Sequence, residues 1–235
     1  MPWDKAPIKV DVLYGYEGRT DHRIRNFMFG IFMCGIAGVV ALDGALAEAG
    51  QVKAMLGALQ HRGPDDSGVF VGGLVGLGST RLSILDITTA GRMPMKDLGN
   101  GNQIIHNGEI YNFKELVDEL ALGPCATRTD TEVILKTYAK LGPDCVNHFN
   151  GIFAFAIWDD KRAELFAARD RLGVKPFFYS RLKNRLIFAS EIKALFAAGV
   201  SCRPDYGAIR DYLCEGIYDH GSRTFFDGVT QLPPG

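Results

Sequence analysis

The sequence lacks an excess of charge of either sign, and it lacks paired cysteines. Its 235 residues include 26 Lys and Arg against 27 Asp and Glu, a formal net charge of −1. This balance gives no indication of the basic surface with which proteins bind nucleic acid, so we predict no nucleic-acid partner. The cysteines are odd in number, widely spaced and contain no CxxC pair: Cys34, Cys125, Cys145, Cys202 and Cys214. We therefore predict no metal site and no disulfide framework, and we expect a cytoplasmic location.

A long hydrophobic segment is also lacking. Residues 27–42 carry no charge and follow Arg19, Arg23 and Arg25, so they imitate the basic and apolar regions of a signal peptide. The run is shorter than the roughly 20 residues that span a bilayer, and glycines interrupt it. Met33 is moreover a poor residue before a cleavage site. We predict no membrane association, and export stays an alternative that cell fractionation tests.

What remains is the composition of an ordinary globular domain, 47% hydrophobic and 23% charged. Residues 48–60 have the pattern of a helix that ends before the loop-forming stretch "HRGPDDSG". The stretch "GVFVGGLVGLGSTRLSIL" has the pattern of two strands joined by a Gly-Gly turn. Residues 103–112 have the pattern of a strand that breaks at Asn107-Gly108.

Two further helices carry their own start signals. Asn112 with Glu115, and Thr129 with Glu132, have the spacing of a capping pair. The rest of the chain predicts four closely spaced strands and then two short helices: "GIFAFAIWDD", "AELFAARD", "KPFFYSRL", "RLIFASE", residues 191–197 and residues 205–214. This order predicts antiparallel sheets covered by helices, a layered α/β arrangement.

Cys34, in "FMCGIAGVV", allows two interpretations. Free cysteines are among the most buried residues, so Cys34 could be a small core side chain. If Met33 is instead the translation start and is removed, Cys34 becomes the first residue. Its α-amino group, with a pKa of about 7.7 to 8, could then take the thiol proton and return it to a leaving amine. The histidines show no triad arrangement that would supply a different base.

Eight motifs in order decide between these interpretations. The motifs are "MCGIAG", "HRGPDDSG", "RLSILD", "NGEIYN", "TDTEVI", "GIFAFAIWD", "RDRLGVKP" and "ASEIKAL". Together they closely resemble the glutaminase domain of the asparagine synthetase family, a class II glutamine amidotransferase of the N-terminal-nucleophile type. The resemblance covers about residues 33–235. It implies an α+β fold, the four-layer α/β/β/α sandwich of the N-terminal-nucleophile hydrolases with antiparallel sheets.

The resemblance implies that the domain hydrolyses L-glutamine to glutamate and ammonia through a thioester on Cys34. It makes Asn107 and Gly108 the oxyanion hole, through a side-chain amide and a backbone N–H. Taken alone, Asn-Gly would indicate an ordinary hairpin turn. The family needs no cofactor for this reaction, and ATP and Mg are expected only for a synthetase domain.

The resemblance also implies the residues that bind glutamine. Arg81 matches the clamp on the α-carboxylate, for which the guanidinium fork is suited; by itself it could be a surface arginine. Asp130 matches the carboxylate that receives the α-ammonium, with Glu109 in the same pocket; by itself Asp130 would only complement a helix dipole. Backbone groups at Ile84 and Leu85 complete the set. "HRGPDDSG" is expected to form a mobile loop over glutamine, whereas "RDRLGVKP" and "ASEIKAL" are expected to be framework.

The chain departs from the family pattern at both ends. We interpret residues 1–33 as an extension, from a wrongly assigned start or a pro-segment, residues 34–200 as the amidotransferase domain and residues 201–235 as the link to a synthetase domain. The Ser-Gly-Gly-x-Asp-Ser nucleotide loop and a P-loop are absent from the sequence. Expected partners are L-glutamine and a synthetase domain in cis or in trans, with a homodimer as a possibility.

Two other hypotheses stay open. The chain could be a non-catalytic or partner-dependent module in which Cys34 is blocked. Its parent could also be an amidotransferase for another acceptor, although "RLSILD", "NGEIYN" and "ASEIKAL" argue against the sugar-phosphate and phosphoribosyl branches. N-terminal sequencing and an ammonia-release assay distinguish the first alternative from the enzyme.

Overall fold

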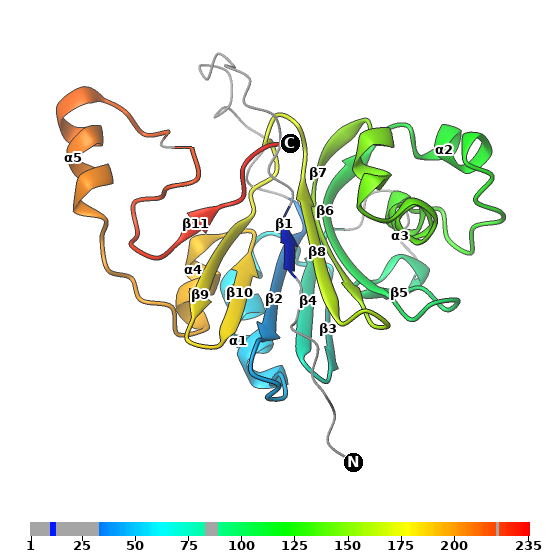
Figure 1. The fold of residues 1–235 in the computed structure, drawn as a ribbon, viewed down its shortest axis with the longest axis horizontal. Helices are drawn as coiled ribbons and strands as arrows, with labels where there is room; N and C mark the ends of the chain where they lie inside the picture. Colours follow the sequence, from blue (N-terminus) through cyan, green and yellow to red (C-terminus); the bar gives the residue numbers. More distant parts are fainter. Residues whose placement is uncertain (1–9, 13–32, 83–88, 220) are drawn as a thin grey trace.

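The computed structural model describes residues 10–12, 33–82, 89–219 and 221–235. These residues form two β-sheets that pack face to face between two layers of helices (Figure 1). The first sheet consists of β1 (Val10–Val12), β8 (Glu164–Arg169), β7 (Gly151–Asp159), β6 (Gln103–Ile110) and β5 (Met95–Lys96), in that spatial order. The second consists of β11 (Thr230–Gln231), β9 (Phe178–Leu182), β10 (Arg185–Ala189), β2 (Gly35–Ala41), β4 (Val75–Arg81) and β3 (Asp66–Gly72).

Helices cover the outer face of each sheet. The first sheet is covered by α2 (Phe113–Glu119) and α3 (Asp130–Leu141), and the second by α1 (Ala49–Leu59) and α4 (Ile192–Ala197) (Figure 1). Among the described elements, the 3-10 helices η2 (Thr89–Gly91) and η3 (Gly142–His148) precede β5 and β7, and α5 (Tyr206–Glu215) lies near the C-terminus. This is the predicted α/β/β/α order of layers. Within the described part of the chain, no helix combines the length and the apolar character that crossing a bilayer requires.

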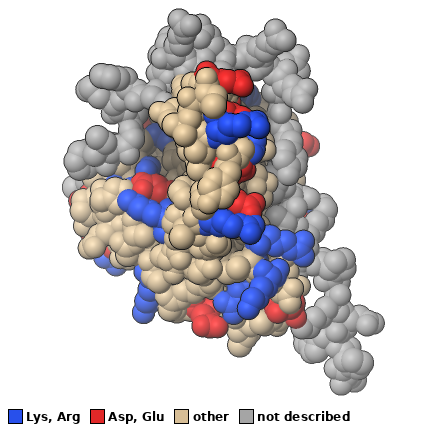
Figure 2. Space-filling model, turned by 90° about the vertical axis from the view of Figure 1, so that its left-hand side faces the viewer, with Lys and Arg blue, Asp and Glu red and all other residues tan. Residues whose placement is uncertain are grey.

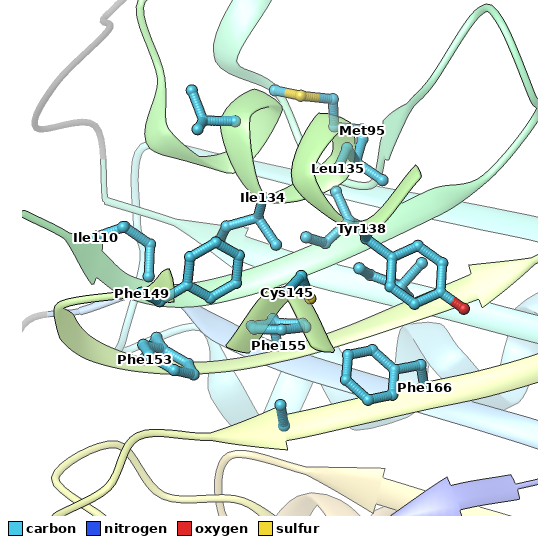
Figure 3. Close-up of a cluster of buried hydrophobic side chains, with 14 of the residues drawn as sticks. Met95, Ile110, Ile134, Leu135, Tyr138, Cys145, Phe149, Phe153, Phe155 and Phe166 are labelled. Atoms are coloured by element: carbon cyan, nitrogen blue, oxygen red, sulfur yellow. The ribbon is translucent and has the colours of Figure 1, made fainter. Parts of the chain in front are cut away.

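Three apolar clusters fill the spaces between the four layers. Alternation along β7 shows why its sequence is apolar on both faces: Phe153, Phe155 and Ile157 pack under α2 and α3, whereas Ala154 and Ala156 face the second sheet. Figure 3 shows the outer cluster, in which aromatic rings from β7, from β8 and from Phe149, directly after η3, lie beneath α3. Tyr138 of α3 and Phe166 of β8 stack at 5.2 Å between ring centroids. The small alanines on the inner face allow the sheets to approach each other closely.

Strand β6 does not break at Asn107-Gly108, so that prediction was wrong. It runs from Gln103 to Ile110 and pairs with β7 along its whole length. Gly108 keeps the ladder intact with φ +145°, and a Cβ at this position would lie 2.1 Å from the Ile152 carbonyl oxygen. Glycine is needed here for close approach between two strands rather than for a turn.

The stretch "HRGPDDSG" is less of a loop than predicted. Its second half is already strand, because β3 begins at Asp66, and Pro64 forms a bridge with Arg81. Gly63 packs so tightly that a Cβ there would lie 2.4 Å from the Arg81 backbone nitrogen. The predicted helix at 48–60 and its end are confirmed by α1.

The two predicted capping pairs gave the positions of α2 and α3 correctly, but the capping bond predicted for Asn112 is absent. Thr129 caps α3 as predicted, accepting a hydrogen bond from the Glu132 N–H. Asn112 does precede α2, but its side chain makes no capping bond. Its amide instead donates to the His148 carbonyl and accepts from the Asn150 N–H, both at 2.9 Å, and so ties the start of α2 to the end of η3. A capping rule considers only neighbouring residues, so it cannot predict bonds to partners 36 and 38 residues away.

Strand β1 is the exception to the antiparallel pairing of the described strands. It lies within the segment interpreted as an extension and pairs with β8 in parallel. The outer edge of β8 offers free backbone groups, which a segment from elsewhere in the chain can pair with in either direction.

The face that carries α5 shows basic and acidic side chains interspersed (Figure 2). Arg223 pairs with Asp205 and Arg203 with Asp227 on this side of the molecule. Only Ala208 of α5 is buried, whereas Tyr206, Tyr212 and Leu213 are exposed.

Candidate active site

Cys34 stands directly before β2, the strand at the middle of the second sheet. Strand alternation puts its side chain on the same face as Ile36 and Val40, which pack against the first sheet. The Cys34 thiol donates weakly to the Leu82 carbonyl, with 3.7 Å between sulfur and oxygen. Burial raises the pKa of this thiol, and the positive charges of Arg81 and Arg62 offset only part of that effect. The thiol therefore stays protonated near neutral pH and needs a base to become a nucleophile.

The backbone from Cys34 to Ile36 is held from both neighbouring strands. The Gly35 N–H donates to the Thr80 hydroxyl of β4 at 3.1 Å, and the Ile36 N–H donates to the Ser190 hydroxyl, just after β10, at 3.0 Å. These bonds fix the point at which the thiol leaves the sheet.

A buried ion pair holds the Cys34 carbonyl. Arg62, from "HRGPDDSG", donates through Nε to the Cys34 oxygen at 3.2 Å and through Nη1 to Glu191 at 2.8 Å. Burial raises the pKa of Glu191, but hydrogen bonds from Arg62, Lys193 and His61 outweigh it and lower the pKa to about 2. Two motifs that are 129 residues apart thus meet at the backbone of Cys34.

Five of the predicted site residues line one cavity. Cys34, Arg81, Gly108, Glu109 and Asp130 surround a space of about 60 Å³ between the end of β2, the edge of β6 and the start of α3. The two predicted residues Ile84 and Leu85 lie outside the described residues.

The cavity lies beside an unpaired edge of β6. Among the described residues, β5 pairs with β6 only at Gln103 and Ile104, so no described strand pairs with the rest of that edge. The His106 N–H points outward to the Met93 sulfur at 3.3 Å, and the Ile110 N–H points outward to Asp130 at 2.8 Å. Because strand N–H groups alternate in direction, the Gly108 N–H lies on this same edge between them. It is therefore a backbone donor beside the cavity that Gly108 lines.

Asn107 is buried completely, and its side chain does not line the cavity. Neither its amide nitrogen nor its amide oxygen has a hydrogen-bond partner within the described residues. It faces the second sheet, as does its neighbour across β7, Ala154. A buried amide without a partner is costly to the fold, which is typical of a functional group rather than a structural one.

Arg81 and Asp130 bring opposite charges to the lining of the cavity. Arg81 ends β4 and is 7% exposed; a Cβ at Gly91 would lie 2.4 Å from its Nη2 atom, so glycine leaves the room that the guanidinium occupies. Asp130 is the first residue of α3. One of its oxygens accepts from the Ile110 N–H, and the other lies 4.0 Å from Nδ1 of His106. The second oxygen is oriented toward polar neighbours of the cavity rather than toward the helix backbone.

His106 is a cavity residue that the sequence did not identify. Its Nδ1 atom pairs with the Thr131 hydroxyl at 3.1 Å, and Nε2 has no partner in the described structure. Burial lowers the pKa of this imidazole, so it is neutral. It stands two positions before Gly108, and the alternation of side chains along a strand could have indicated that both share a face.

The second residue that the sequence missed is Lys175. Asp170 does organise the loop "RDRLGVKP" as expected of a framework, accepting from the N–H groups of Val174 and Lys175 at 2.9 and 3.0 Å. The side chain of Lys175, however, is 2% exposed and its ammonium donates to the thioether of Met33, which also lines the cavity. No local pattern distinguishes such a lysine from a surface one.

Comparisons with known proteins agree with this geometry. The family described as "glutamine amidotransferase domain" matches residues 33–235. "Asparagine synthetase [glutamine-hydrolyzing] 3" of Bacillus subtilis is 44% identical over 86% of this chain and 34% of its own length. A putative asparagine synthetase 2 of Methanocaldococcus jannaschii is also 44% identical, over 70% of this chain and 35% of its own length. The chain thus spans about a third of the length of these curated relatives.

A solved structure supports the fold. Glutamine phosphoribosylpyrophosphate amidotransferase of B. subtilis, in complex with ADP and GMP, superposes with a TM-score of 0.61 at 21% identity, over 71% of this chain and 44% of that one. The predicted four-layer sandwich with antiparallel sheets is therefore confirmed. With the family matched over residues 33–235, the chain belongs to the glutamine amidotransferase domains.

Proposed function

We propose that this domain hydrolyses the side-chain amide of L-glutamine, releasing L-glutamate and ammonia, with Cys34 as the nucleophile. One observation carries the proposal: Cys34, a guanidinium, a backbone donor and two carboxylates line a single cavity at the edge of β6. A thiol opposite fixed hydrogen-bond donors is the arrangement that acyl transfer requires.

The reaction starts with the thiol proton. In a form that begins at Cys34, the α-amino group accepts that proton, and the sulfur forms a bond to the amide carbon of glutamine. The resulting oxyanion accepts hydrogen bonds from the Gly108 N–H and, after its side chain turns to the cavity, from Asn107. The α-ammonium returns the proton to the leaving nitrogen, the C–N bond breaks, and ammonia departs. Water, deprotonated by the same amine, then cleaves the thioester to glutamate and the free thiol.

Recognition of glutamine follows from charge. Arg81 is assigned the α-carboxylate, for which two parallel N–H donors are suited. Asp130 and Glu109, which line the same cavity, are assigned the α-ammonium. The pair of opposite charges selects a free amino acid, since a glutamine residue within a peptide carries neither group.

Met33 is the reason for proposing that the active form begins at Cys34. With Met33 in place, Cys34 has an amide nitrogen instead of a basic amine. The cavity that Met33 helps to line is about 60 Å³, far below the roughly 300 Å³ at which ligand pockets usually begin. Removal of Met33 would supply both the base and the space. The five free cysteines fit the cytoplasm, where thiols stay reduced.

The ammonia is proposed to serve a synthetase domain in cis or in trans, as in the asparagine synthetases to which the chain is similar. The exposed apolar side chains of α5 offer such a domain a contact surface. ATP and Mg would act there, where the acceptor is also chosen. The second candidate function is a non-catalytic module in which Cys34 is blocked. It is favoured only for the form that keeps Met33, because Cys34 then has an amide nitrogen and the cavity is small.

The test compares two forms of the protein: the chain with residues 1–33, and a chain started at Met33 whose N-terminus is shown by mass determination to be Cys34. We expect ammonia release from glutamine only in the second form, and covalent labelling of Cys34 by an electrophilic glutamine analogue. Cys34→Ala should lose both, whereas the control Cys202→Ala, at an exposed cysteine, should lose neither. Equal turnover by the chain that keeps residues 1–33 would refute the requirement for a free amine.

A further inference from the structure

Lys175 carries an amine that the mechanism above does not use. It lies in the loop between β8 and β9, and its ammonium has no carboxylate within ion-pair distance among the described residues. The acceptor that the structure gives it is the Met33 thioether, and thioethers accept hydrogen bonds only weakly. Buried ammonium groups are normally paired, so this position is costly and needs another reason.

The contact with Met33 puts Lys175 close to the backbone nitrogen of Cys34. Five covalent bonds separate the Met33 sulfur from that nitrogen, a span of roughly 6 Å at most. When Met33 is removed, Lys175 loses its thioether partner at the place where the α-amine of Cys34 is created. Two amines then lie within roughly 9 Å of each other, near the same buried cavity.

Charged and titratable groups face Lys175 from each of the elements that pack against it. Asp170 lies on its own loop, Glu109 on β6 and Arg62 between α1 and β3, while Cys34 itself precedes β2. Burial is the main cause that lowers the pKa of Lys175, Arg62 adds to it, and Asp170, Glu109 and Cys34 oppose it; the net result is a pKa of about 8. That value is close to the ordinary pKa of an α-amine, about 7.7 to 8. Two such amines titrate as a coupled pair, which holds a single proton over a range around neutral pH.

We propose that Lys175 is a positioning residue that retains this proton and so keeps the α-amine of Cys34 free to act as the base. The proposal rests on the proposed function, because it concerns the form that begins at Cys34. At roughly 9 Å and an effective dielectric constant of about 20, one positive charge lowers the pKa of a neighbouring amine by about one unit, and by more at a shorter distance.

The test uses the protein that begins at Cys34 and three variants of it. Lys175→Met removes the charge with little change in shape, Lys175→Arg keeps the charge, and Lys53→Met removes an exposed lysine of α1 as a control. Two pH profiles are measured: kcat/KM for glutamine, and the rate at which iodoacetamide alkylates Cys34. The acid limb of both profiles should move up by about one pH unit in Lys175→Met and stay in place in Lys175→Arg and Lys53→Met.

A direct titration of the α-amine in the parent protein tests the proposal without any variant, which could fail to fold for other reasons. Competitive acetylation of the α-amine in the parent protein should give an apparent pKa below about 7.7. A value of 8 or more, or profiles that only lose amplitude in Lys175→Met, would overturn the role of Lys175. Absence of ammonia release from the parent refutes the proposed function instead, since neither acetylation nor alkylation involves glutamine.

Discussion

Replacing Asn107 by Leu should make the fold more stable and the enzyme inactive. Leucine has the same number and branching of side-chain heavy atoms as asparagine, so it fills the same space between the sheets. The amide of Asn107 is fully buried and unpartnered in the described structure, and a buried polar group without a partner costs about 1–3 kcal/mol. We therefore expect the free energy of unfolding to rise by about 1–3 kcal/mol.

For a domain of this size, 1 kcal/mol corresponds to about 2–4 °C in the midpoint of thermal unfolding, so the midpoint should rise by roughly 2 to 10 °C. Loss of one oxyanion donor should lower kcat by about 10²–10³-fold. Urea unfolding and calorimetry measure the first effect, and enzyme-coupled detection of ammonia measures the second. Both are made on the protein that begins at Cys34.

Asn102→Leu is the matched control for activity. It lies directly before β6, also buries an amide oxygen without a partner, and does not line the cavity. Its kcat should stay within a factor of about three of the parent. If Asn107→Leu instead loses more than about 1 kcal/mol of stability, the amide has a structural partner and the reasoning fails. Unchanged turnover in that variant would remove Asn107 from the oxyanion hole.

Three further predictions concern the carboxylate-binding Arg81, strand β6 at Gly108 and the ion pair of Glu191 with Arg62. Arg81→Lys should raise KM for glutamine about 10-fold or more with a smaller change in kcat, measured by steady-state kinetics, because lysine cannot form two parallel bonds to a carboxylate. Gly108→Ala should fail to fold or unfold at much lower urea, because its Cβ would lie 2.1 Å from the Ile152 oxygen; a normal unfolding midpoint would contradict this. Glu191, whose pKa is lowered to about 2 from 4.5, stabilises the fold fully above pH 4.5 and loses that contribution as pH falls toward 2. The loss in the free energy of unfolding is at most roughly 3 kcal/mol, and it is smaller where solvent screens the pair with Arg62. Urea unfolding repeated from about pH 6 to 3 should show this loss in the parent and not in Glu191→Gln.

Local patterns predicted the elements well because each depends on neighbours in sequence. The helices at 48–60 and after Thr129, and the apolar strand "GIFAFAIWDD", are all present, and the layers are in the expected order. The wrong predictions share a cause. The strand through Gly108 continues because β7 pairs with it, and the amide of Asn112 bonds to η3 instead of to its own helix. Both outcomes depend on residues about 40 positions away, which no local rule includes.

Site residues were predicted through the family resemblance rather than from spacing. Cys34, Arg81 and Asp130 come from three different parts of the chain, and only the pairing of strands brings them to one cavity. His106 and Lys175 were missed because each has an ordinary local interpretation, as a strand residue and as a charged loop residue. Their roles depend on burial, which places an imidazole and an ammonium in the interior beside the cavity.

The bonds that hold Cys34 explain how a cut directly before it could leave the site intact. The backbone of residues 34–36 is held by Arg62, Thr80 and Ser190, and these bonds go to the Cys34 carbonyl or to N–H groups after it. They come from both sides because β2 lies between β4 and β10 in the sheet. Removal of residues 1–33 would give up the pairing of β1 with the edge of β8, but it would leave these three bonds in place. The nucleophile is therefore positioned by the sheet, whereas its base depends on where the chain begins.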